Sequence, residues 1–199
     1  MITEIELKAH VLDSEVLRSQ LSEKGEYLET FEKDDTYWFP DSADFSTSGL
    51  YPYGLRVREE KRKLQNGTEE SITLVTYKIK EQRNNIETND EQEFEVKPRP
   101  LFEGFLRRMG LKPGAAKRKR GWAFSHGRIR AELTEVEDLG WFVEIEILVS
   151  DNREETIAKA RQELLVFLDS LGVGRDALES RSYLQMLSEL PKKRPSDDG

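Results

Sequence analysis

Pairs of like-charged side chains recur in six segments of the chain, with one residue between the two members of each pair. Three pairs are acidic and three are basic: Glu4/Glu6, Glu93/Glu95, Glu144/Glu146, Arg56/Arg58, Lys78/Lys80 and Lys117/Lys119. Residues at i and i+2 of a strand share one face and lie about 6.5–7 Å apart. Carboxylates suit a hard divalent cation, whereas Lys and Arg suit phosphate oxygens. Together the pairs predict a site for a metal-chelated polyphosphate.

A strand face that simply meets water is the alternative explanation for any one of these pairs. Such a face gains from mixing opposite charges between neighbouring strands, because like charges side by side repel each other. The segregation of six pairs by sign therefore indicates that the charges have a use. A closed antiparallel barrel would bring all of them into one lumen, since small barrels project alternate residues inward.

The composition limits the class of protein. The chain has 199 residues, of which 36% are hydrophobic and 35% are charged, and its formal net charge is −8. This length fits one domain, expected over residues 1–190, followed by a disordered tail over residues 191–199. The negative charge disfavours duplex nucleic acid as a partner. With no cysteine, no visible signal peptide and no membrane-length apolar run, we expect a cytoplasmic protein that binds no membrane.

The hydrophobic pattern indicates an α+β fold built on an antiparallel sheet. Strands are expected at residues 2–11, 34–39, 55–63, 71–80, 91–97, 116–124, 128–133 and 140–149. Helices are expected at residues 13–24, 100–110, 151–172 and 180–190. Asp151 and Glu154 have the spacing of a capping box, and Gly172 marks a helix end.

The turn at residues 66–67 decides whether two of the basic pairs share a face. Asn-Gly there is a strong hairpin signal, and a two-residue turn would place Arg56/Arg58 and Lys78/Lys80 on opposite faces. Both pairs can enter one lumen only if the residue numbers of any two residues that face each other across the hairpin sum to an even number. We therefore predict a three- or five-residue loop, or one β-bulge, between the two pairs.

The order of these blocks resembles the CYTH superfamily, also called triphosphate tunnel metalloenzymes. The resemblance starts at Glu4-x-Glu6-x-Lys8 and continues through LRVR, TYKIK and EFEV to EVEDLGWFVEIEI, over residues 2–149. The later segment RSYLQML is similar to the ending of the class IV adenylyl cyclase branch. The resemblance implies an eight-stranded antiparallel barrel, or tunnel, with flanking helices. It also implies binding of a nucleotide or inorganic triphosphate together with Mg²⁺ or Mn²⁺.

Each charged pair gains a role from this resemblance. The metal ligands implied are Glu4, Glu6, Glu144 and Glu146. The phosphate-binding residues implied are Lys8, Arg56, Arg58, Lys78, Lys80, Lys117 and Lys119. Glu4, Glu6 and Lys8 would also be catalytic, and Glu93 and Glu95 would line the tunnel. In the segment KRKR the lysines are favoured over Arg118 and Arg120, because Lys-x-Lys followed three residues later by Trp122 better matches the family pattern.

One position departs from the family pattern. The closing motif usually has Asp two residues before the Val of EVEDLG, where this chain has Thr134. Glu132 shares a face with that position on a regular strand, so we expect it to serve as the replacement metal ligand. The alternative is that Glu132 only pairs with a neighbouring cation such as Arg130.

Three functions fit these observations. The preferred function is a class IV-like adenylyl cyclase that converts ATP to cyclic AMP and pyrophosphate. The enzymatic alternative is a phosphatase that removes the terminal phosphate of tripolyphosphate or thiamine triphosphate. A non-enzymatic module that binds a nucleotide or polyphosphate is the third, and the many carboxylates disfavour it. The expected partner in each case is a small triphosphate, and the sequence leaves a homodimer open.

Overall fold

One antiparallel sheet of eight strands organises the computed structural model. The structure describes residues 3–40, 55–83, 86–151 and 153–191, and for residues 78–83 and 86–91 it describes the backbone alone. The strands are β1 (Thr3–His10), β2 (Glu26–Pro40), β3 (Leu55–Leu64), β4 (Glu69–Arg83), β5 (Ile86–Glu95), β6 (Leu111–His126), β7 (Ile129–Val136) and β8 (Gly140–Val149). The helices are α1 (Ser14–Lys24), α2 (Arg99–Arg108), α3 (Glu154–Ser170) and α4 (Tyr183–Glu189), with a 3₁₀ turn at Arg175–Ala177.

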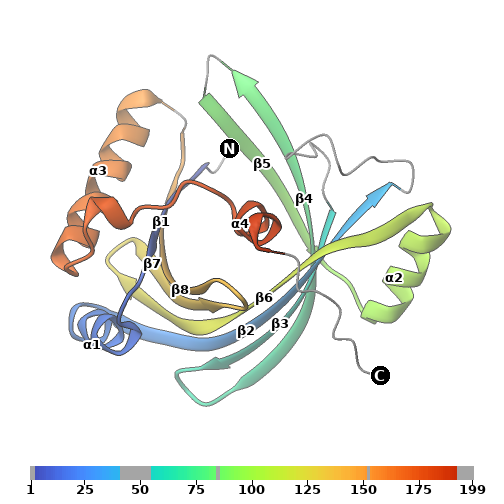
Figure 1. Ribbon diagram of the computed structural model, residues 1–199, viewed down its shortest axis with the longest axis horizontal. Coiled ribbons are helices and arrows are strands. Elements are labelled where there is room, and N and C mark those ends of the chain that lie inside the picture. The colour runs from blue at the N-terminus through green and yellow to red at the C-terminus, as the bar shows by residue number, and fades with distance from the viewer. Residues whose placement is uncertain (1–2, 41–54, 84–85, 152, 192–199) are drawn as a thin grey trace.

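The sheet is strongly curled, so it has a concave inner face and a convex outer face (Figure 1). Its strand order is β1-β8-β7-β6-β2-β3-β4-β5, which makes β1 and β5 the two edges. These edges approach each other, yet no backbone ladder joins them within the described residues. The α+β class and the eight antiparallel strands are as predicted, whereas the closed barrel is not detected.

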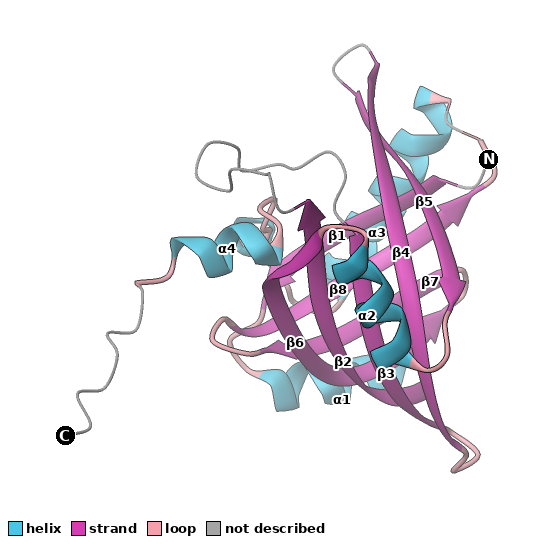
Figure 2. Ribbon diagram, turned by 90° about the vertical axis from the view of Figure 1, so that its right-hand side faces the viewer, coloured by secondary structure: helices cyan, strands magenta, loops and turns pink. Residues whose placement is uncertain are grey.

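The hairpin of β4 and β5 gives a physical reason for the open edge. The pairing of β3 with β4 runs from Lys63 opposite Glu69 to Leu55 opposite Tyr77. The pairing of β4 with β5 continues as far as Arg83. Among the described residues, the hairpin beyond Tyr77 is therefore a two-stranded ribbon, and such ribbons twist more strongly than wide sheets. Figure 2 shows this part of the hairpin extending past the other strands.

Helices cover two separate areas of the outer face. Helix α3 packs on β1 and β8, and helix α1 packs on β2, β6 and β7; Leu21 and Leu164 join a core that includes Ile145 and Ile147. Helix α2 packs elsewhere, with its Leu106 in a second core beside strands β2, β3 and β4. Because apolar side chains alternate with charged ones along these strands, covering the outer face leaves the charged residues on the inner face.

The loop between β3 and β4 has three residues, as predicted from the parity of the charged pairs. The Leu64 N–H donates to the Thr68 carbonyl at 2.9 Å, which leaves residues 65–67 as the loop. Gly67 has a φ of 83°, the left-handed conformation that such loops require. Arg56 consequently lies opposite Thr76, so their position numbers sum to an even number. The side chains of the second pair, at positions 78 and 80, lie outside the described residues.

Several element boundaries differ from those predicted, among them the starts of β5 at Ile86 and β6 at Leu111 rather than at residues 91 and 116. Strand β2 begins at Glu26 rather than near residue 34, and the added part contains the buried charges Glu29 and Lys33. Helix α3 begins at Glu154 with Arg153 as its N-cap, so the proposed capping box is wrong. The Asp151 carboxylate accepts hydrogen bonds from Arg153 before the helix starts. The expected tail at residues 191–199 lies almost entirely outside the described residues.

The close pairing of β6 and β7 leads to a prediction about glycine. A Cβ atom at Gly121 would overlap the Leu133 carbonyl of β7, whereas a Cβ atom at Gly104 of α2 would contact nothing within 4 Å. We expect Gly121→Ala to reduce the free energy of unfolding by about 3 kcal/mol through overpacking. Gly104→Ala should increase it by about 0.5–1 kcal/mol through helix propensity. Urea denaturation measures both, and equal effects of the two substitutions would contradict this packing.

Candidate functional site

The inner face of the sheet gathers charged side chains from most of the strands. Those anticipated from the sequence are Glu4, Glu6, Lys8, Arg56, Arg58, Glu93, Lys117, Lys119, Glu132, Glu144 and Glu146. Those that the sequence analysis missed as site residues are Glu29, Lys33, Asp35, Glu60 and Arg130. Glu95 of β5 lies opposite Leu74 of β4, and its side chain is exposed. Most of the predicted site residues therefore share one surface.

Three carboxylates at the junction of β1 and β8 could hold a metal ion. Glu4, Glu6 and Glu146 each offer an oxygen atom within 4.8 Å of the others. Burial, followed by the nearby charges of Glu144 and Glu4, raises the pKa of Glu6 to about 7. Burial, Glu132 and Glu6 also raise the pKa of Glu146. Repulsion of this kind is what a divalent cation relieves, so the donor set fits Mg²⁺ or Mn²⁺.

Two further carboxylates are instead bound to lysines. Glu144 accepts a hydrogen bond from the Lys119 ammonium at 2.7 Å. Glu132 accepts hydrogen bonds from Lys33 at 2.8 Å and from Lys119 and Arg130 at 3.2 Å each. Burial alone would raise the pKa of both carboxyls, but the neighbouring cations, with Lys119 foremost, lower it. Glu132 thus makes the cation pairs that were the alternative to a metal role, and that metal role stays a prediction.

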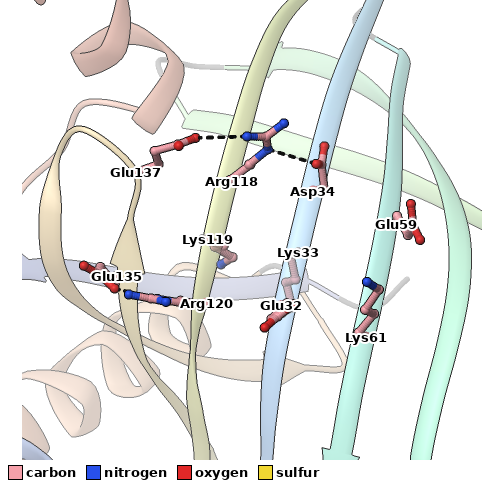
Figure 3. Close-up of a pocket in the computed structure, with 10 residues that line it drawn as sticks. All are labelled: Glu32, Lys33, Asp34, Glu59, Lys61, Arg118, Lys119, Arg120, Glu135 and Glu137. Carbon is pink, nitrogen blue, oxygen red and sulfur yellow. Dashed lines mark hydrogen bonds and ion pairs between the residues drawn. The ribbon is translucent and has the colours of Figure 1, made fainter.

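Strand β6 places its two lysines and two arginines on opposite faces. The Lys117 and Lys119 side chains are 8% and 7% exposed, against 66% and 71% for Arg118 and Arg120. On the outer face Arg118 pairs with Asp34 and Glu137, and Arg120 with Glu135, as Figure 3 shows. The structure therefore favours the lysines as inner-face residues.

The outer face around these arginines differs in charge pattern from the inner face. A depression of about 500 Å³ lies there, and one row across it reads Glu135, Arg120, Glu32, Lys61 on successive strands. Alternating signs of this kind are expected of a surface that meets water. The contrast supports the inner face as the candidate site, although the outer face has this depression.

A buried ion cluster occupies the centre of the inner face. Arg58 donates from Nε and Nη2 to the two carboxylate oxygens of Asp35, at 2.6 and 2.9 Å. The Lys117 ammonium lies 3.1 Å from the same carboxylate, whose side chain is fully buried. Although burial would raise it, the pKa of Asp35 lies far below its usual value because of these two cations. The cluster contains two of the predicted phosphate-binding residues.

Helix α4 lies at one end of the inner face. In Figure 1 the sheet curls around it, and the view in Figure 2 places it at one end of the strands. Tyr183 of α4 packs against Phe142 of β8, and its ring lies 4.4 Å from the Lys8 ammonium and 5.2 Å from that of Lys117. Burial and the neighbouring Glu144 raise the pKa of the Tyr183 hydroxyl, which therefore stays neutral. The C-terminal segment thus borders the lysines of the site.

Comparison with known proteins decides the family. The profile of the CYTH domain matches residues 3–183. The chain belongs to the CYTH family. CYTH proteins act on triphosphates with the help of divalent metal ions. The resemblance inferred from the ordered charged pairs is confirmed.

Relatives of this CYTH protein support the assignment. A Methanocaldococcus jannaschii protein named as a candidate adenylate cyclase is 25% identical over 184 residues, which cover 92% of this chain and 97% of that protein. The PH1819 protein from Pyrococcus horikoshii has a similar structure, with a TM-score of 0.74 and 28% identity, over 94% of this chain and 98% of that one. A Hippeastrum protein, described as a candidate adenylyl cyclase with a dominant triphosphatase activity, has a TM-score of 0.66 at 17% identity, over 96% and 98% of the two chains. At that identity the likeness concerns the fold alone.

None of the helices in the described part of the chain is long and apolar enough to cross a membrane.

The position where the CYTH pattern usually has Asp is buried in this chain. Thr134 is fully buried opposite Phe142 of β8. Its hydroxyl has no hydrogen-bond partner among the described residues. It takes no part in the carboxylate cluster of Glu4, Glu6 and Glu146. That cluster alone supplies three oxygen donors without a carboxylate at position 134.

The raised pKa of Glu6 gives a prediction about stability. The folded protein holds a proton on Glu6 up to about pH 7, whereas the ordinary carboxyl pKa is 4.5, so raising the pH through this window destabilises the fold. In metal-free buffer at pH 8, Glu6→Gln should therefore melt a few degrees above the wild type. The gain stays modest because the Glu6 side chain, although crowded by neighbouring protein atoms, is still exposed enough for solvent to screen part of the repulsion.

This difference should disappear near pH 4.5, below the window of the shift. Added Mg²⁺ should raise the melting temperature of the wild type more than that of the variant, since the variant has lost a ligand. Glu135→Gln on the outer face is the control and should show neither effect. A variant that melts below the wild type at pH 8 would contradict the repulsive cluster.

Glu132 should behave in the opposite way. Glu132→Gln leaves Lys33 and Lys119 short of a countercharge, so we expect a loss of about 3 kcal/mol in the free energy of unfolding at pH 7. Because the pKa of Glu132 is depressed, this loss is complete above the ordinary carboxyl pKa of 4.5 and shrinks as the pH falls below it. Urea denaturation at several pH values measures the loss.

Mn²⁺ titration tests whether Glu132 is a metal ligand. That role requires Glu132→Gln to weaken Mn²⁺ binding more than Thr134→Ala does.

Proposed function

We propose that this protein is a divalent-metal-dependent enzyme acting on a small triphosphate, with class IV-like cyclisation of ATP as the preferred reaction. The observation that carries the proposal is the division of the inner face into two adjoining parts. One part is the repulsive cluster of Glu4, Glu6 and Glu146. The other part is a set of buried cations, including Lys117 and Lys119, that their own carboxylates hold in place. A metal-chelated polyphosphate has charges complementary to both parts.

The carboxylate cluster would hold Mg²⁺ or Mn²⁺, which supplies Lewis-acid chemistry at phosphate oxygens when bound. Glu144 accepts a hydrogen bond from Lys119, so of the four metal ligands first predicted it is the one with the least support. The remaining residues would bind phosphate oxygens and stabilise the charge that develops on the leaving pyrophosphate. They are Lys8, Arg56, Arg58, Lys117 and Lys119, with Lys78 and Lys80 proposed from the sequence alone.

Lys8 has a special place in this scheme because it adjoins both parts of the inner face. It lies opposite Glu144 on β8 and follows Glu6 by two residues on β1. Burial lowers the pKa of its ammonium, while Glu144 and Glu6 raise it. A triphosphate that reaches from the carboxylate cluster to the buried cations would pass this ammonium, which fits the catalytic role proposed for Lys8.

Hydrolysis of the terminal phosphate is the second candidate reaction, supported by the triphosphatase activity described for the Hippeastrum protein. The same charged face would serve both reactions, because both need a bound metal and a neutralised triphosphate. They differ in the nucleophile, which is the ribose 3′-hydroxyl in cyclisation and a water molecule in hydrolysis. The name of the Methanocaldococcus jannaschii relative supports cyclisation.

Product analysis tests this proposal. The purified protein is incubated with Mn²⁺ or Mg²⁺ and either ATP, tripolyphosphate or thiamine triphosphate, and the products are separated by chromatography. We expect cyclic AMP and pyrophosphate from ATP, while orthophosphate release would support the second reaction. Glu146→Gln should reduce turnover by about 100-fold or more, because a metal contributes several kcal/mol to the transition state. Glu135→Gln on the outer face is the matched control, and undiminished turnover with the metal chelated would refute the proposal.

A further inference from the structure

Asp35 of β2 is the most completely enclosed of the carboxylates described on the inner face. Its side chain is fully buried. Both of its oxygens accept from the fork of Arg58, and one of them also lies 3.1 Å from the Lys117 ammonium. It joins three strands, because it stands opposite Arg58 of β3 on one side and Lys117 of β6 on the other.

The geometry of this contact leaves binding capacity on both cations. Asp35 accepts hydrogen bonds from Nε and Nη2 of Arg58, whereas Nη1 of Arg58 lies 3.9 Å from the Glu60 carboxylate. An ammonium has three donors, of which Asp35 needs one from Lys117. A bidentate contact also fixes the plane of the guanidinium. An arginine without such a contact would lose this conformational freedom only when it binds the anion, which costs binding free energy. Asp35 can thus orient both cations while other donors on them reach an anion.

Burial creates a second need for this carboxylate. Lys117 faces Asp35 on β2, Arg58 on β3, Lys119 on its own strand, Glu144 on β8, Tyr183 on α4 and Lys8 on β1. Burial lowers its pKa to about 8, Asp35 raises it as the largest opposing influence, and Lys119 and Arg58 lower it further. Without Asp35, three neighbouring cations would face Lys117 and only the more distant Glu144 would oppose them. The ammonium would then lose its proton near neutral pH.

We propose that Asp35 is a positioning residue that holds Arg58 and Lys117 oriented and charged for contact with a phosphate group of the substrate. This inference rests on the proposed function of the inner face. Asp35 itself would not touch the substrate, because its oxygens are already bonded to the two cations. Its negative charge repels a polyanion, so its removal has two opposite effects. When Lys117 is neutral, removal of Asp35 should weaken anion binding, because the loss of positioning is the larger effect. When Lys117 is protonated, removal of Asp35 should leave anion binding unchanged or strengthen it, because the loss of repulsion is the larger effect.

The next residue on the strand supplies a matched control. Asp34 carries the same charge but lies on the outer face, where it pairs with the exposed Arg118 at 3.0 Å. Asp34→Asn and Asp35→Asn remove the same charge from adjacent positions of β2. A difference between the two variants therefore reports the contacts of Asp35 rather than the net charge of the protein.

Tripolyphosphate binding without metal tests the proposal. Isothermal titration calorimetry with tripolyphosphate, in chelator, is done at pH 6 and pH 8 on the wild type and both variants. At pH 8 we expect Asp35→Asn to bind about tenfold more weakly than the wild type, equivalent to one lost charge-assisted hydrogen bond. At pH 6 its affinity should equal or exceed that of the wild type. Asp34→Asn should follow the wild type at both pH values. Unchanged or tighter binding by Asp35→Asn at pH 8, or the same loss in Asp34→Asn, would overturn the proposal.

A ligand-free measurement separates failure of this inference from failure of the proposed function. NMR follows the Arg58 Nε–H signal and the titration of the Lys117 side chain in the absence of any anion. Asp35→Asn should broaden the Arg58 signal and lower the Lys117 pKa, and unchanged values would overturn the positioning role. A wild type that fails to bind tripolyphosphate both in chelator and with Mg²⁺, while Asp35→Asn shows both NMR effects, would refute the proposed function but keep the local positioning.

A second substitution keeps the test valid if Asp35→Asn does not fold. Asp35→Glu retains the charge but moves it by one methylene, so Lys117 stays protonated while the Arg58 fork is displaced. We expect binding of tripolyphosphate to weaken several-fold by the same amount at pH 6 and pH 8. Wild-type affinity at both pH values would overturn the proposal.

Discussion

Pairing of buried ions is the interaction on which this structure depends. A charge removed from water is unfavourable unless an opposite charge and hydrogen bonds replace the lost hydration. The inner face satisfies this requirement with short contacts between strands, such as Asp35 to Arg58 and Glu132 to Lys33. These contacts join β2, β3, β6 and β7 across the concave side, where apolar packing is scarce. Two apolar cores lie on the outer face, and a third, which includes Phe142 and Tyr183, lies where α4 meets the inner face. The two faces therefore rely on ion pairing to different extents.

The requirement is met unevenly, and this unevenness gives the site its chemistry. Glu132 and Glu144 have cation partners and a lowered pKa, whereas Glu6 and Glu146 have a raised pKa beside other carboxylates. The first two act as internal counterions for the lysines. The others form a region of excess negative charge at the β1–β8 junction, which a metal ion would neutralise. One sheet face therefore presents a cluster of mutually repelling carboxylates and a set of buried cations at close range, which are the two parts of the proposed site.

Alternation of side chains made much of this face predictable from the sequence. Like-charged pairs two residues apart identified the inner-face residues of β1, β3, β6 and β8. Parity required a three- or five-residue loop or one β-bulge before β4, and the structure has the three-residue loop. Lys33 and Asp35 escaped notice because they form a pair of opposite sign, which a search for like charges passes over. The start of β2 escaped notice as well, since its buried residues include charged ones that look solvent-exposed in a sequence. The open edge depends on how a two-stranded ribbon twists, and no residue pattern encodes that directly.

The contact between the C-terminal segment and β1 affects the order in which the site can form. Leu178 bridges to Ala9, the Glu179 N–H donates to the Lys8 carbonyl at 2.8 Å, and the Lys8 ammonium bonds to the Arg181 carbonyl. Strand β1 pairs otherwise with β8 alone, so both of its neighbours are made late in synthesis. A nascent chain consequently carries Lys8 on an unpartnered strand until the last part of the fold has left the ribosome. Strand β1 is therefore made before either of its neighbours, and the charged face stays incomplete until both of them have been synthesised.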